Sequence, residues 1–118
     1  LFSEGVVKGR LSLPRFVELV STSPARLFGL APQKGTLLPG SDADVVILDP
    51  DVTWAMSVEN LHMGSDWSAY GDIKVTGKVD KVFSRGELIL DGEKMIGKKG
   101  RGRYLARKLD SKIRPTIY

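Results

Sequence analysis

The sequence contains no cysteine and only one histidine, His62, among its 118 residues. The absence of cysteine excludes a disulfide framework. It also leaves almost none of the sulfur and imidazole ligands with which proteins bind zinc. A chain without cysteine fits a reducing compartment, so we expect a cytoplasmic protein. No apolar run approaches the roughly 20 residues that a membrane-spanning helix needs, so we expect no membrane partner.

Four aspartates flank one apolar segment. Asp42 and Asp44 precede the run Val45-Val46-Ile47-Leu48, and Asp49 and Asp51 follow it. Two interpretations are open: a metal or acid–base site, or turn formation. We favour turn formation, especially for Asp42 and Asp49, because carboxylates at strand ends commonly bond to nearby backbone amides. The spacing also lacks the bidentate glutamate of an EF-hand calcium loop.

The other reactive groups do not combine into a catalytic site. His62 has no second histidine and no cysteine in the chain to complete a site, so we interpret it as structural or surface-exposed. The serines have no nucleophile-elbow context. The segment Lys98–Arg103 lacks the preceding strand and the Lys-Ser/Thr ending of a phosphate-binding loop. The sequence therefore assigns no catalytic, metal-binding or substrate-binding residue.

The charge of the chain is unevenly distributed. Residues 98–118, the basic arm, contain eight basic residues and one acidic residue, which gives +7. The whole chain carries +4, so residues 1–97 carry −3. A basic tail can bind nucleic acid or an acidic protein surface. The alternatives are a solvated terminal arm and an arm that docks on another part of a larger assembly. Only Tyr104 and Tyr118 lie among the basic residues, and base stacking needs more aromatic groups, so nucleic acid is the disfavoured partner.

The first thirty residues predict helices. Ser12 is an N-cap candidate before an apolar face at helical spacing. The segment 21–24 predicts a break, after which Ser23 caps a second short helix with Pro24 at its first position. Gly29 suits the left-handed position after that helix.

From Gly35 onward the sequence predicts strands. The segment 39–42 has turn residues, and Val45-Val46-Ile47-Leu48 is too short for a helix. Because its apolar residues do not alternate with polar ones, we expect burial on both faces, and we expect Asp49-Pro50 to end the strand. Strands resume at 79–84, turn at Arg85-Gly86 and continue through 87–90. Asp91-Gly92 then predicts a tight hairpin.

Four passages resemble the C-terminal region of dihydropyrimidinases and D-hydantoinases, the cyclic amide hydrolases of the amidohydrolase superfamily. They cover nearly the whole chain, from Phe2 to about Lys108. They are Phe2-Ser3-Glu4-Gly5-Val6-Val7-Lys8-Gly9-Arg10-Leu11-Ser12 with Phe16–Leu19 and Ser23-Pro24-Ala25; Lys34-Gly35-Thr36 through Gly40-Ser41-Asp42-Ala43-Asp44 to Asp49-Pro50; Tyr70, Val75-Thr76-Gly77 and Ser84-Arg85-Gly86; and Gly97–Gly100 with Arg101-Gly102-Arg103-Tyr104-Leu105.

This resemblance implies an α+β fragment. Residues 1–34 would be the terminal helices of a metal-bearing (β/α)8 barrel. Residues 35–97 would be the returning half of a small β-sandwich that is assembled from both ends of the chain. Residues 98–118 would be a basic C-terminal arm on a neighbouring subunit, with Arg101, Arg103, Tyr104 and Arg107 as its interface candidates. The chain begins at Leu1 rather than methionine, and we expect the chemistry to lie upstream of Leu1.

The resemblance also implies the chemistry and the partners of the parent enzyme. Two zinc ions would activate a bridging hydroxide that opens the ring of a dihydropyrimidine or a hydantoin. The metal ligands of the family precede Leu1, so we expect no metal on this segment. The expected partners are the rest of the parent chain, sister subunits of a homo-oligomer (a homotetramer) and a small cyclic amide substrate.

Two alternatives remain open at this point. Non-catalytic dihydropyrimidinase-like proteins keep this region without the metal ligands. An autonomous β-rich binding module would use its basic tail on an acidic or nucleic-acid partner.

Overall fold

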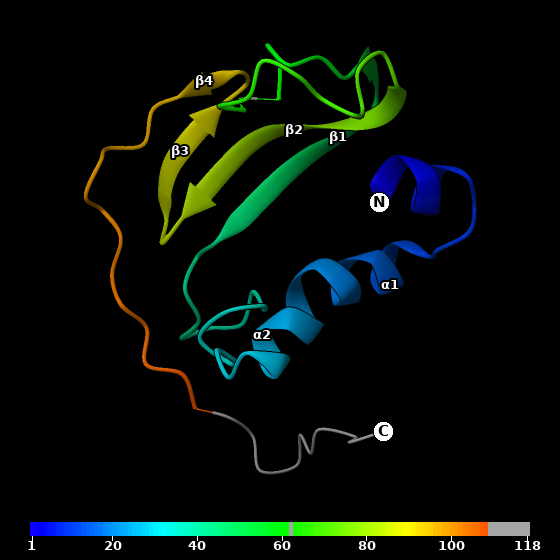
Figure 1. Cartoon of the computed structure of the whole chain (residues 1–118). Coiled ribbons are helices and arrows are strands. Elements are labelled where there is room, and N and C mark those ends of the chain that lie inside the picture. Colours follow the sequence, from blue (N-terminus) through cyan, green and yellow to red (C-terminus); the bar gives the residue numbers. More distant parts are fainter. Residues whose placement is uncertain (62, 109–118) are drawn as a thin grey trace, which may run out of the picture.

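A computed structural model describes residues 1–61 and 63–108 (Figure 1). His62 and residues 109–118 lie outside the described residues, and so do the predictions that fall on them. In the described part, short helices come first and one antiparallel sheet follows, which confirms the α+β class. None of the described helices is long and apolar enough to cross a bilayer.

The helical segment begins with a π-helical turn, η1 (Phe2–Val7). A longer run follows, made of α1 (Leu13–Val17), the π-helical turn η2 (Glu18–Thr22) and α2 (Ser23–Leu27). The Ser12 hydroxyl accepts a hydrogen bond from the Arg15 amide at 3.3 Å, so the predicted N-cap is confirmed.

The predicted break at residues 21–24 is wrong. Thr22 and Ser23 both have right-handed helical dihedral angles, so Ser23 is not an N-cap. Proline in a helix interior lacks an N–H and crowds the preceding turn. The η2 turn lies immediately before Pro24, and the Ser23 amide donates to the Glu18 carbonyl, five residues back. This wider turn lets the helix continue through Pro24 instead of stopping.

Gly29 ends the helical run as the sequence predicts. Its φ is +69°, in the left-handed region that glycine adopts without steric cost. The Leu30 amide donates to the Ala25 carbonyl at 2.8 Å, and the Gly29 amide donates to the Arg26 carbonyl at 3.1 Å. This pair of bonds is a Schellman motif.

The sheet has four antiparallel strands in the order β1 (Val45–Ala55), β2 (Lys74–Ser84), β3 (Glu87–Asp91) and β4 (Lys94–Met95). The prediction that Asp49-Pro50 ends the first strand is wrong, because β1 continues to Ala55. Its register with β2 shifts between Asp49 and Thr53. The strand therefore accommodates Pro50 in a stretch of irregular pairing at the edge of the sheet.

Both hairpins form at the predicted glycines. Arg85 and Gly86 connect β2 to β3 with φ values of +50° and +77°, the backbone of a two-residue type I′ turn. In the second hairpin Asp91 pairs with Lys94, so the turn residues are Gly92 and Glu93, one position later than the sequence predicts.

The helical segment meets the sheet where η1 lies on β2. The Ser3 hydroxyl accepts a hydrogen bond from the Thr76 amide at 3.1 Å. The Phe2 ring lies against the backbone of Gly77, where a Cβ atom would come within 2.4 Å of the ring. Phe2 also packs edge-on against Phe16, with 5.5 Å between the ring centroids. Because Gly77 has no side chain, it leaves room beside β2 for the N-terminal turn.

The described residues enclose almost no core. Ala25, at 6% exposure, is the one buried apolar side chain among them. The radius of gyration is 16.5 Å, whereas a compact chain of this length has one of about 13 Å. The expected burial of β1 on both faces is not met among the described residues, because the adjacent residues Val46 and Ile47 are 60% and 44% exposed. Strand β1 also lies at the edge of the sheet rather than in its centre.

Candidate functional site

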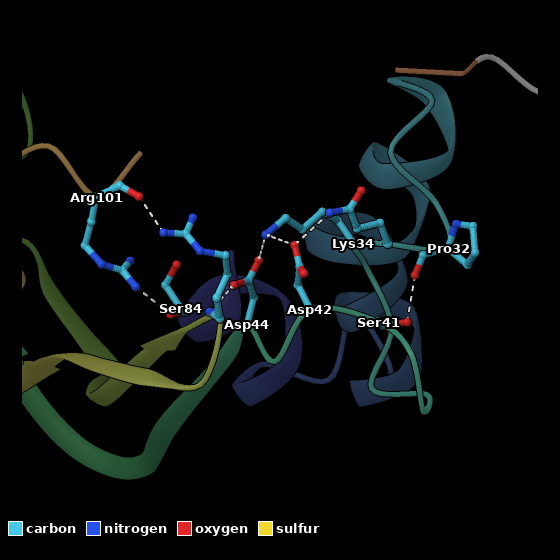
Figure 2. A network of polar contacts seen from close by, with 9 residues as sticks. Pro32, Lys34, Ser41, Asp42, Asp44, Ser84 and Arg101 are labelled. Carbon is cyan, nitrogen blue, oxygen red and sulfur yellow. Dashed lines mark hydrogen bonds and ion pairs between the residues drawn. The ribbon is translucent and has the colours of Figure 1, made fainter. Parts of the chain in front are cut away.

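A cluster of charged side chains joins the end of the helical segment to the sheet (Figure 2). This polar cluster consists of Lys34, Asp42, Asp44, Arg85 and Arg101. Lys34 follows α2, the two aspartates precede β1, Arg85 lies in the β2–β3 turn and Arg101 lies in the basic arm. Four segments of the chain therefore meet at one place.

Lys34 lies between the two aspartates. Its ammonium is 2.8 Å from the carboxylate of Asp42 and also pairs with that of Asp44. The Lys34 side chain is only 19% exposed. Asp42 accepts a further hydrogen bond from the Gln33 side chain at 3.3 Å. The carboxylate of Asp42 thus binds side chains of the preceding segment rather than the nearby turn amides that we expected.

The ion pairs hold all three groups in their charged forms. Burial lowers the pKa of Lys34, but its hydrogen bonds to Asp42 and Asp44 outweigh burial and the pKa lies above its usual value. Burial raises the pKa of Asp44, but hydrogen bonds from Lys34 and from the Arg85 amide outweigh it and the pKa is lowered. The hydrogen bond from Lys34 lowers the pKa of Asp42.

Asp44 links Lys34 to the β2–β3 turn. Its carboxylate accepts a hydrogen bond from the Arg85 amide at 2.8 Å, and the Gly86 amide donates to the Ala43 carbonyl at 2.9 Å. Arg85 has a positive φ, which is uncommon for a residue with a side chain. The hydrogen bond that the Arg85 amide donates to Asp44 therefore stabilises a turn conformation that a non-glycine residue adopts at a cost.

Arg101 fastens the basic arm to the same turn. Its guanidinium donates to the Ser84 carbonyl at 2.7 Å and to the carboxylate of Glu87 at 3.0 Å. In return, the guanidinium of Arg85 donates to the Arg101 carbonyl. The side chain of each arginine thus binds a backbone carbonyl in the segment that carries the other arginine. The planar guanidinium, with donors along several edges, suits this double contact.

The four predicted interface residues divide into two groups. Arg101 is 20% exposed and contacts its own chain. Arg103, Tyr104 and Arg107 are exposed, Tyr104 to 91%. The structure therefore brings Arg101 into the polar cluster and leaves the other three on the surface of the chain.

Asp49 forms the turn that the sequence predicts. Its carboxylate accepts a hydrogen bond from the Asp51 amide at 3.0 Å, which is an Asx turn. Asp49 and Asp51 lie within β1, beyond the polar cluster.

The described residues do not fit a metal centre. Within residues 1–61 and 63–108, no three histidine, aspartate or glutamate side chains come together as metal ligands. Asp42 and Asp44 do converge, but the ammonium of Lys34 already provides their positive counter-charge. The polar cluster can hold segments together, and it offers no donor set for zinc.

Large apolar side chains are exposed on both the helices and the sheet. Monomeric proteins rarely leave extensive apolar surface uncovered. Examples in the helical segment and the loop that follows it are Val7, Leu13, Val20, Leu27, Phe28, Leu37 and Leu38, and examples in the sheet are Val46, Ile47 and Met95. These surfaces are the second candidate for a functional role, as contact areas.

The sequence reasoning missed Lys34 and Arg85. One signal for Lys34 was available, because a lysine eight and ten residues before two aspartates offers a counter-charge across a turn. Arg85 carried no such signal, since its role depends on a backbone amide that a tertiary contact places beside Asp44.

Comparison with known proteins finds relatives in both sequence and structure. The sequence model described as the amidohydrolase family matches residues 2–89. D-phenylhydantoinase of Escherichia coli O1:K1 / APEC is 52% identical over 108 residues, which are 92% of this chain and 23% of that protein. D-hydantoinase of Geobacillus stearothermophilus is 49% identical over 107 residues, 91% of this chain and 23% of the relative.

A solved structure agrees with these sequence matches. Dihydropyrimidinase from Brevibacillus agri NCHU1002 superposes with a TM-score of 0.88 at 48% identity, over 91% of this chain and 23% of that one. The chain thus spans about a quarter of the length of the relatives that it matches.

Proposed function

The chain belongs to the amidohydrolase family, and we propose that it is the C-terminal, non-catalytic part of a metal-dependent cyclic amide hydrolase that opens hydantoin or dihydropyrimidine rings. In this role residues 1–34 complete the catalytic barrel, residues 35–97 complete a β-sandwich, and residues 98–118 contact a sister subunit of a homo-oligomer.

The observation that carries this proposal is the combination of high identity and short coverage. Identity of 52% extends over 92% of this chain, yet the match covers 23% of the hydantoinase. A segment with this likeness is expected to fold as the corresponding segment of a hydantoinase does. Its function is then to complete a larger structure.

The exposed apolar surface supports an assembly role over an autonomous binding module. A module that folds alone buries a hydrophobic core of its own. Among the described residues only Ala25 is buried in this sense, while Phe28 and Val46 are about 60% exposed. The rest of the parent chain is the partner that would cover them.

The zinc ions implied by the family do not fit the described residues, which offer no group of three ligands. The ligands would come from elsewhere in the parent protein, and no catalytic step is assigned to residues of this chain.

The test is ring-opening activity of the full-length parent protein, loaded with zinc. Dihydrouracil and a 5-substituted hydantoin are assayed side by side, with loss of the ring followed by absorbance and the carbamoyl product by mass. We expect hydrolysis of at least one substrate. Failure to hydrolyse either substrate in protein with verified metal content contradicts the proposal. Protein that binds no metal and hydrolyses neither substrate would indicate a non-catalytic relative.

A further inference from the structure

The described part of the basic arm is fixed to the rest of the chain at two separated points. At the first point, Arg101 donates to Ser84 and Glu87 at the β2–β3 turn, as described above. At the second, the Lys108 amide donates to the Gly29 carbonyl at 2.8 Å. The arm thus runs from the sheet back to the C-terminal end of α2, as the ribbon in Figure 1 also shows.

These two attachments complete a ring of polar contacts. From Gly29 the chain leads to Lys34, which pairs with Asp44. Asp44 binds the amide of Arg85 in the β2–β3 turn, and this turn binds Arg101. Residues 101–108 then lead back to Gly29. The ring connects the end of the helical segment to the sheet along two routes.

We propose that residues 101–108 act as a strap that closes this ring and fixes the helical segment at a set angle to the sheet, with Arg101 as its positioning residue. The N-terminal end of the helical segment is held at β2 by Ser3 and Phe2. A body held at one end can pivot, and a second attachment at the other end prevents this. The strap and the polar cluster provide that second attachment.

The strap assigns Arg101 a role different from that of its neighbours. Arg101 faces inward and binds its own chain, whereas Arg103, Tyr104 and Arg107 are exposed along the span between the two attachments. Replacing Arg101 would therefore change where the whole span lies. Replacing Arg103 would remove a charge from the span without releasing it.

The test measures hydrogen–deuterium exchange of the Lys108 amide in the full-length protein. Arg101→Gln removes the charged donor, and Arg101→Lys keeps the charge without the planar fork. Arg103→Gln is the matched control, since it removes the same charge two residues away. Asp44→Asn tests the ring itself, because Asp44 lies outside the strap; Asp51→Asn, an exposed carboxylate in β1, is its control.

We expect Arg101→Gln to raise the exchange rate of the Lys108 amide by about tenfold, since it removes charge-assisted hydrogen bonds. Arg101→Lys should give a smaller increase, and it tests the strap even if Arg101→Gln does not fold. Asp44→Asn should also raise the rate, while both controls leave it unchanged. An unchanged rate in the Arg101 variants would overturn the strap. A rise in those variants without one in Asp44→Asn would overturn the closed ring.

Discussion

Replacing Gly77 by alanine should separate the helical segment from the sheet. Gly77 has a φ of +96°, and a Cβ added there would lie 2.4 Å from Cδ1 of Phe2. A left-handed backbone costs a residue with a side chain about 1–2 kcal/mol. The Phe2 ring must also move, and its edge-on contact with Phe16 is of a kind that contributes about 0.5–1.5 kcal/mol. We therefore expect the free energy of unfolding to fall by about 1.5–3.5 kcal/mol.

Gly40→Ala is the matched control for this substitution. Gly40 has a similar φ of +91°, but a Cβ there would meet no atom within 4 Å. It follows Pro39 in a turn closed by the Ser41 amide and the Leu38 carbonyl. Gly40→Ala should therefore cost only the backbone term of about 1–2 kcal/mol. The difference between the two variants measures the contact of Phe2 with the sheet.

Urea unfolding of the full-length protein measures both free energies. Exchange of the Thr76 amide, which donates to Ser3, gives a local reading of the same junction. We expect faster exchange of this amide in Gly77→Ala and no change in Gly40→Ala. Equal destabilisation by the two substitutions, with the Thr76 amide still protected in both, would refute the close approach of η1 to β2.

Two further predictions concern the ion pairs and the apolar surface. The lowered pKa values of Asp42 and Asp44 mean that their contribution to stability is present above the unfolded pKa of about 3.9 and is lost as pH falls through the folded values. The raised pKa of Lys34 makes its contribution complete below about pH 10.4 and lost as pH rises further. Lys34→Met should thus lower the unfolding free energy by a constant amount between about pH 5 and 9 and by less in acid; a difference that persists at pH 2 would contradict the pairing. The 118-residue chain expressed alone should self-associate in light scattering, because Phe28 and Val46 are exposed. A chain that is monomeric in light scattering and unfolds cooperatively in urea would contradict the assembly role.

The sequence predicted the elements whose causes are local. Ser12 caps α1 through its own hydroxyl, Gly29 supplies a left-handed residue at the helix end, and Arg85-Gly86 forms a two-residue turn. In each case the deciding interaction lies within a few residues of the signal. The Asx turn at Asp49 was predictable for the same reason.

The errors occurred where a neighbouring turn or a pairing between strands overrides the usual effect of a single residue. Pro24 normally starts or breaks a helix, but the π-helical turn before it provides space for its ring and the helix continues. Pro50 normally ends a strand, but pairing of β1 with β2 resumes at Thr53. The spacing of Lys34 and Asp42 allowed an ion pair, but the pair forms only because the chain folds back between these two residues.

The polar and the apolar side chains of this segment have different roles, and this difference predicts whether a substitution changes stability, assembly or substrate preference. Its own segments are joined by polar contacts, such as those of Ser3 with Thr76 and of Arg101 with Glu87. Its large apolar side chains, in contrast, mostly remain exposed. Such a segment sets its internal geometry by directional bonds and offers apolar area to a partner, which non-directional hydrophobic contacts can cover. If that partner is the catalytic part of the same protein, substitutions here change stability and assembly before they change which ring is opened. A variant of the polar cluster that altered the preference between hydantoin and dihydrouracil at unchanged stability would show that this separation is wrong.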